Sequence, residues 1–241
     1  MITIFNKEIN EFLNSLVAYI TIGIFLIGTG LIMWIFPDTN VLEYGYATLE
    51  PVFSFGPYVF LFLIPAITMR SFAEERRSGT LELLFTLPFR SWQIIMGKYL
   101  ASVFLVLFAL LPTFLYYYSI YQLGNPRGNL DTSGILGSYL GLFLLGAVFT
   151  AIGLFCSAIT QNQIVAFVLA AFSCFLIYQG FEAIATVDVW GTWSYYLEQL
   201  GISFHYSSMS KGVLDLRDLA YFFGLIILLL LGTYVVLENK K

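Results

Sequence analysis

The chain alternates long apolar blocks with short polar segments. A helix needs about 20 mostly apolar residues to cross a hydrocarbon core of about 30 Å. Six blocks meet or approach that length, and they cover residues 17–36, 53–69, 99–121, 134–159, 164–184 and 219–237. The pattern predicts an all-α polytopic membrane protein, a single transmembrane domain over residues 1–241. Because six is an even number, both termini are expected on the same side.

Two further segments have helical periodicity without the length of a span. Within residues 1–16 apolar side chains recur at helical spacing, with Asn, Lys and Glu between them. This predicts an N-terminal amphipathic helix along the membrane surface. Within residues 185–218, Trp190, Trp193 and Leu197 recur in the same way. We expect short helices there, at the outer interface between spans five and six.

Residues 70–98 form a charged segment between the second and third spans, with eight Lys, Arg, Asp or Glu side chains. Ser71 and Glu74 have the spacing of a capping box, which predicts a helix start. Gly79 is a suitable helix stop, and Thr80 can cap a second short helix. The segment is therefore predicted to be a structured elbow containing a coupling helix, although a plain solvated loop is the alternative.

Composition and charge give the class and the orientation. The chain is 59% hydrophobic and only 11% charged, which excludes a soluble globular domain. Eight of the 11 Lys and Arg residues fall in residues 1–16, in residues 70–98 or after residue 237. Basic residues concentrate on the cytoplasmic side of membrane proteins. The elbow and both termini are therefore predicted to be cytoplasmic.

The chemistry that the sequence lacks is also informative. There is no GxxxxGK[ST], HExxH, CxxC or GxSxG motif, so the chain is predicted to bind no cofactor or metal and not to be an enzyme. Apart from Glu182 near the outer end of the fifth, the six predicted spans contain no Asp, Glu, Lys, Arg or His, which argues against an ion- or proton-driven carrier. Energy for any uphill transport must then enter through residues 70–98. Cys156, Cys174 and His205 are predicted to be structural residues.

Proline and glycine in the spans leave two interpretations each. Pro57 and Pro65 can kink the second span and pass motion from the elbow, or they have no function there. Gly137 and Gly141 form a GxxxG step that predicts close helix packing, within the chain or at a subunit interface.

Two stretches resemble a known family. SFAEERRSGTLELLFTLPFRSWQIIMGKYLA (71–101) resembles the coupling region of bacterial ABC-transporter permeases of the type-2 (export) class. FHYSSMSKGVLDLRDLAYFFG (204–224) is similar to the gliding-motility (GldF) branch of that class. With six spans and a surface helix at the start, the resemblance covers essentially the whole chain. Neither stretch fixes the transported molecule.

The resemblance implies a six-helix half-transporter in the bacterial inner membrane. Its partners would be a second permease chain, identical or related, and cytoplasmic ABC ATPase subunits, with no nucleic acid. The residues implied to lie in or beside the helix that contacts the ATPase are Glu74, Glu75, Arg76, Arg77, Thr80, Leu81, Glu82 and Leu83. A non-transporting membrane scaffold for a motility or secretion complex is the alternative function, and a channel or secondary carrier is disfavoured by the uncharged spans.

Overall fold

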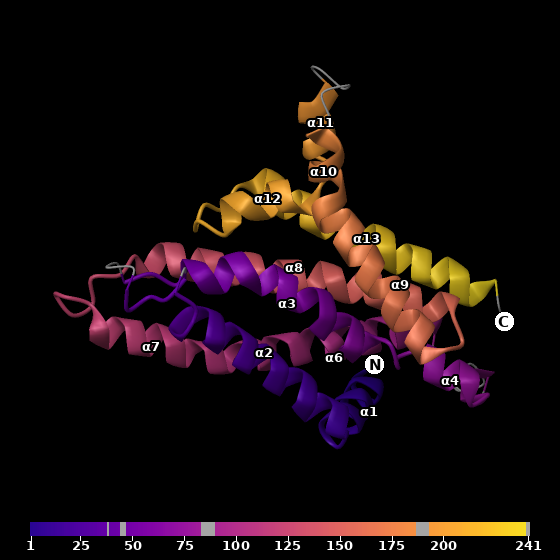
Figure 1. The fold of residues 1–241 in the computed structure, drawn as a ribbon. Helices are drawn as coiled ribbons and strands as arrows, with labels where there is room; N and C mark the ends of the chain where they lie inside the picture. The colour runs from indigo at the N-terminus through magenta and orange to yellow at the C-terminus, as the bar shows by residue number, and fades with distance from the viewer. Residues whose placement is uncertain (38, 44–46, 83–89, 187–192, 240–241) are drawn as a thin grey trace.

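The computed structural model describes residues 1–37, 39–43, 47–82, 90–186 and 193–239, and the described chain is helical without strands. The helices in chain order are α1 (Ile2–Leu13), α2 (Leu16–Trp34), α3 (Glu50–Thr68), α4 (Ala73–Arg77), α6 (Ser91–Leu110), η1 (Leu111–Thr113), α7 (Phe114–Leu123), α8 (Thr132–Ile159), α9 (Gln163–Phe175), η2 (Leu176–Gly180), α10 (Phe181–Ala185), α11 (Ser194–Glu198), α12 (Ile202–Met209) and α13 (Leu216–Glu238). Figure 1 shows their arrangement.

Six helical stretches among the described residues are long and apolar enough to cross a membrane, which confirms the predicted number of spans. Two of them are interrupted. The third span changes from α6 to α7 through the 3₁₀ turn η1, which contains Pro112. The fifth span passes from α9 to α10 through η2, a single π-helical turn. Proline and π-helical turns are both established causes of local helix distortion.

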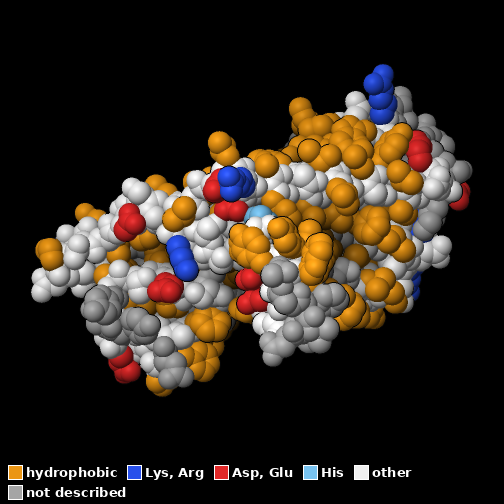
Figure 2. All heavy atoms as spheres, turned by 90° about the horizontal axis from the view of Figure 1, so that it is seen from above, with side chains coloured by type: hydrophobic (Ala, Val, Ile, Leu, Met, Phe, Trp, Pro, Cys, Tyr) orange, Lys and Arg blue, Asp and Glu red, His pale blue; other side chains and the backbone are white. Residues whose placement is uncertain are grey.

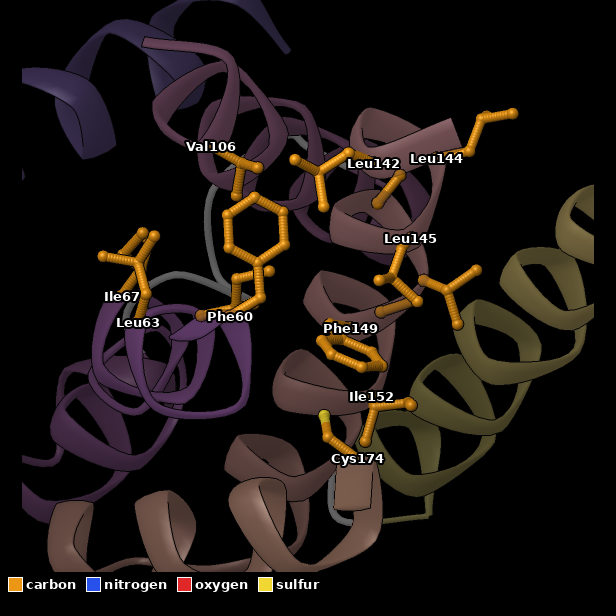
Figure 3. Close-up of a cluster of buried hydrophobic side chains, with 14 of the residues drawn as sticks. Phe60, Leu63, Ile67, Val106, Leu142, Leu144, Leu145, Phe149, Ile152 and Cys174 are labelled. Atoms are coloured by element: carbon orange, nitrogen blue, oxygen red, sulfur yellow. The ribbon is translucent and has the colours of Figure 1, made fainter. Parts of the chain in front are cut away.

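Helix α8 forms the centre of the bundle. It packs against α3, α6, α9, α12 and α13. Within its most apolar stretch 83% of the residues are buried, against 22% for α2, α9 and α13. Figure 3 shows the core, in which α8 side chains such as Leu145 and Phe149 lie between Phe60 of α3, Val106 of α6 and Cys174 of α9. The outer helices therefore leave apolar side chains exposed, as a lipid environment permits.

The elements divide between the two ends of the bundle (Figure 1). Both termini, α4 and the turn between α8 and α9 lie at one end, which we name the α4 end. The loop after α7 lies at the opposite end, which we name the α7 end. The α10–α11 arm projects sideways from the bundle. A shared end for the two termini is what six spans require.

Helix α1 is amphipathic and packs along α6. Its buried residue Ile4 lies against Gly97, where an added Cβ would come within 3.1 Å of the Ile4 side chain. That glycine lets the two helices approach closely. The position of α1 on a membrane surface stays a prediction.

The glycines of α8 show which elements its surface meets. A Cβ on Gly137 would lie 2.8 Å from the carbonyl oxygen of Gly212, and a Cβ on Gly141 would lie 2.7 Å from Met209 Cβ. Gly212 itself has φ +81°, a conformation that favours glycine. The predicted close packing is confirmed, and its partner is the end of α12 with the turn that follows, in the same chain rather than in a second subunit.

Figure 2 shows hydrophobic side chains gathered over a large part of one face, with charged ones in a few places. Exposed apolar side chains on the peripheral helices include Ile24, Ile27, Ile164 and Leu228. A soluble protein rarely exposes so much contiguous apolar surface. The chain is a multi-pass membrane protein.

Candidate functional site

The predicted elbow begins with α4, a five-residue helix that follows α3 almost directly. The sequence suggested that Ser71 and Glu74 would cap it, and this prediction is wrong. The N-cap is Phe72, without a side-chain cap, and Ser71 is buried. Gly79 has φ +72° just beyond the end of α4, as predicted for a helix stop. The first amides of α4 must therefore find partners elsewhere.

Those partners come from Ser157 of α8. Its hydroxyl accepts hydrogen bonds from the amides of Phe72 (3.0 Å) and Ala73 (3.1 Å), and it donates to the carbonyl of Met69 (3.1 Å). Ser157 is completely buried. One hydroxyl thus satisfies the backbone where α3 stops and α4 starts, groups that would be costly to leave unpaired.

A second contact fixes the other end of α4 to the same helix. The guanidinium of Arg76 donates to the carbonyl of Ile159 at 3.2 Å, in the last turn of α8. A cation there also interacts favourably with the helix dipole. Helix α8 therefore holds α4 at both of its ends.

A buried cation ties α4 to α6 and α1. The ammonium of Lys98 on α6 lies 2.6 Å from Glu8 Oε1 of α1 and 3.0 Å from Glu75 Oε1 of α4. It also donates to the carbonyl of Ser71 at 2.7 Å, and it lies 5.2 Å from the ring centre of Phe72. Only 1% of its side chain is exposed. Breaking such a pair by removing one partner is strongly destabilising.

The electrostatics of this cluster follow from its burial. Burial raises the pKa of Glu8 above its usual range, although Lys98 pulls that pKa down. Partial burial lowers the pKa of Lys7, but Glu75, Glu8 and Glu11 outweigh this effect and the pKa is raised. Lys7 lies 3.2 Å from Glu75 at the surface of the cluster. We call Lys7, Glu8, Glu75 and Lys98 the ion cluster.

A polar cavity of about 60 Å³ lies beside the ion cluster, between α1, α3, α4 and α6. Arg70 Nε and Glu75 Oε2 are buried without a hydrogen-bond partner among the described residues. The cavity has room for a few water molecules, which commonly satisfy such groups. Within the described part of the chain, no three His, Cys, Asp or Glu side chains are grouped as metal ligands would be.

The residues predicted to contact the ATPase differ in their exposure. Arg77, Thr80 and Glu82 are exposed, Glu74, Glu75 and Arg76 are partly buried, Leu81 is buried, and Leu83 lies outside the described residues. Residues 80–82 are helical. We name residues 77–82 the tip. The charged groups of Glu75 and Arg76 bind the bundle, which leaves the tip as the part that faces outward.

Sequence reasoning missed Lys98, Glu8 and Ser157. The charges of residues 70–98 are expected at the cytoplasmic surface, but Lys98 lies on the buried face of α6 with Ile94 and Ile95. That spacing along one helical face was the available signal. The expectation of uncharged spans is corrected accordingly, because Lys98 lies inside the third span.

The sixth span also contains a buried charge. Asp218 lies near the start of α13, and its carboxylate is 2.7 Å from His205 Nδ1 and accepts a hydrogen bond from Ser208. Gln199 O lies 2.9 Å from the other ring nitrogen of His205. The structural role predicted for His205 fits these contacts, which join α12 to α13.

An apolar groove of about 460 Å³ opens between α2, α3 and α9. Its lining includes Phe25 and Gly28 of α2, Tyr58 and Phe62 of α3, and Phe167 of α9. A Cβ added to Gly28 would meet no atom within 4 Å. The groove is thus an open, lipid-compatible surface on the side of the bundle.

Comparison with known proteins identifies the family of the chain. A search of curated proteins found no significant match. The family model described as ABC-2 family transporter protein matches residues 2–240, which is nearly the whole chain. The family forms the membrane component of ABC transporters and is not itself catalytic. The chain therefore belongs to the ABC-2 transporter family, as a permease subunit with six membrane-spanning helices.

Proposed function

We propose that the chain takes up work from a separate cytoplasmic ATPase through the tip and α4, and uses it to move a substrate across the bilayer. The observation that carries this proposal is the fixation of α4 on three sides. Ser157 and Arg76 join it to α8, while Lys98 joins it to α6 and α1. Beyond these contacts, the tip side chains Arg77, Thr80 and Glu82 are exposed. A force applied there reaches the bundle instead of being lost in a flexible loop.

The mechanism is a shift between two conformations of the bundle. A partner can shift such an equilibrium only by binding the two states with different affinity. ATP-driven closure of the ATPase subunits would move their docking surfaces, and α4 with them. Because α4 continues from α3 and is held by α8, these two central helices would be displaced first. Rigid helix displacement is a common form of such transitions.

The α4 end is proposed to be cytoplasmic, in a bacterial inner membrane. Most Lys and Arg residues belong to segments at this end, which supports that orientation. The α7 end, with α12, would then face outward. Both termini would be cytoplasmic.

A second permease chain, identical or related, is proposed to complete the transporter. The open groove between α2, α3 and α9, together with the unoccupied surface at Gly23 and Gly28, supports a partner on this side. The translocation path would run between the two chains. The apolar lining favours a neutral or amphipathic substrate. The similarity of residues 204–224 to gliding-motility permeases supports a role in motility as the setting.

The docking proposal is tested by co-purification with an ATPase encoded beside this chain. Reversing the exposed tip charges, with Arg77→Glu and Glu82→Arg made singly, should weaken association at least tenfold. Arg217→Glu, an exposed change at the α7 end, is the matched control and should leave association unchanged. Equal binding by all three variants would contradict docking at the tip.

The transmission proposal is tested with Ser157→Ala, which removes three buried hydrogen bonds at the start of α4. Docking should persist because the tip is unchanged, but transport per ATP hydrolysed should fall several-fold. Ser119→Ala is the control, since Ser119 is only partly buried and donates an exposed hydrogen bond to the carbonyl of Leu115 in its own helix. An ATPase partner without its P-loop lysine should abolish function; a scaffold would work unchanged with it.

A further inference from the structure

Pro57 interrupts the hydrogen bonds inside α3. Proline has no backbone N–H, so the carbonyl four residues earlier, Phe53 O, loses its helical donor. In a membrane-spanning helix no bulk water replaces that donor, and neighbouring side chains must do so. Phe53 is buried. The second span thus contains a carbonyl, Phe53 O, whose hydrogen-bond donor must come from another element.

That element is α12. The hydroxyl of Tyr206 donates to Phe53 O at 2.7 Å, and only 3% of Tyr206 is exposed. The bond joins residues 153 positions apart in the sequence. Tyr206 therefore supplies the donor that Pro57 lacks.

Helix α12 is held on its other sides as well. His205 and Ser208 contact Asp218 at the start of α13. Ser138 of α8 donates to the carbonyl of Ser210 at 2.8 Å, just after α12. Helix α12 thus links α3, α8 and α13 at the α7 end. A change in the bend of α3 cannot leave α12 unaffected while the Tyr206 bond persists.

We propose that Tyr206 and Pro57 act as one unit that couples the bend of α3 to the position of α12. Tyr206 is then a positioning residue, through which movement begun at α4 reaches the opposite end of the bundle. Helix α3 is the physical connection, since it leads into α4 at one end and holds Phe53 near the other. The inference rests on the proposed function for its role in transport, but the coupling itself is a property of this chain alone.

The coupling is tested first without any partner, by amide hydrogen exchange of the full chain in lipid nanodiscs. Tyr206→Phe leaves Phe53 O unpaired and should raise exchange in residues 202–209 about tenfold. Pro57→Ala returns a helical N–H to Phe53 O. In that background Tyr206→Phe should have little further effect.

Tyr116→Phe is the matched control. Tyr116 donates to the carbonyl of Leu26 at 2.9 Å, but that carbonyl faces the N–H of Gly30 in its own helix. Losing the tyrosine bond there leaves no unpaired group, so the change in exchange should be less than about threefold. Equal effects of Tyr206→Phe with and without Pro57, or an effect no larger than that of Tyr116→Phe, would overturn the proposal.

The role in transport is tested with the ATPase-loaded complex. Tyr206→Phe should lower transport per ATP several-fold while ATP hydrolysis continues, and adding this change to Pro57→Ala should cause no further loss. A purely structural role predicts equal losses of both activities in both backgrounds, and that result would refute the coupling. If no ATPase associates, the proposed function fails while the exchange experiment still decides the link between Pro57 and Tyr206.

Discussion

Replacing Lys98 with methionine is the sharpest test of how α4 is held. The substitution keeps most of the side-chain volume and removes the charge. It leaves Glu8 and Glu75, whose side chains are only 17% and 12% exposed, without their shared cation. It also removes the donor to Ser71 O. Leaving a buried charge uncompensated costs about 3–5 kcal/mol.

The remaining charges set where in that range the cost should fall. Glu8 loses its closest cation, but Lys7 still lies 3.2 Å from Glu75 and compensates part of its charge. Lys7 is 53% exposed, so solvent limits that compensation. Because the compensation is partial and not absent, we expect Lys98→Met to lower the free energy of unfolding by about 3 kcal/mol, at the lower end of that range. Reversible SDS titration in mixed micelles measures this quantity.

Two further variants test whether the ion cluster holds α4. Lys7→Met removes an exposed cation from the same cluster and should cost less than about 1 kcal/mol. The triple variant Lys98→Met, Glu8→Gln, Glu75→Gln removes charge from both sides and should recover most of the loss, because a buried ion pair adds little net stability. If Lys98→Met costs no more than Lys7→Met, or if the triple variant recovers nothing, the ion cluster does not hold α4 as described.

Two further outcomes are expected. Burial raises the pKa of Glu8 in the folded chain, so the protonated carboxyl stabilises the fold below the unfolded pKa, and this stabilisation is lost as pH rises through the folded pKa. Wild type should therefore lose stability relative to Glu8→Gln from about pH 4 upward. A relative gain in stability over the same pH range would refute this. Gly137→Ala should destabilise the chain by about 1–3 kcal/mol, because its Cβ would meet Gly212 O, whereas Gly23→Ala, with no atom within 4 Å, should change stability by less than about 0.5 kcal/mol in the same assay.

The pattern of apolar residues was sufficient to predict the helical class and the six spans. This signal is local, since a helix must cover about 30 Å of hydrocarbon whatever its neighbours are. The stop at Gly79 was predictable for the same reason, because a positive φ is a property of one residue. Span boundaries were less certain: α6 extends back to Ser91, eight residues before the predicted start of the third span.

The contacts that make the candidate site could not be predicted in this way. Ser157 and Phe72 are 85 residues apart, and Lys98 and Glu8 are 90 apart. Nothing in either local sequence identifies the other. The GxxxG step at Gly137 predicted close packing but not that the turn at Gly212 would fill it.

The sequence by itself therefore determined which segments enter the membrane and which segment between them is charged, because hydrophobic length and charge act residue by residue. Only the tertiary structure decided that Glu75 faces inward, that Lys98 is buried, and that Tyr206 supplies the hydrogen-bond donor that Pro57 lacks. These outcomes depend on which helices become neighbours. A buried polar group must find its partner among whatever the fold brings within about 3 Å.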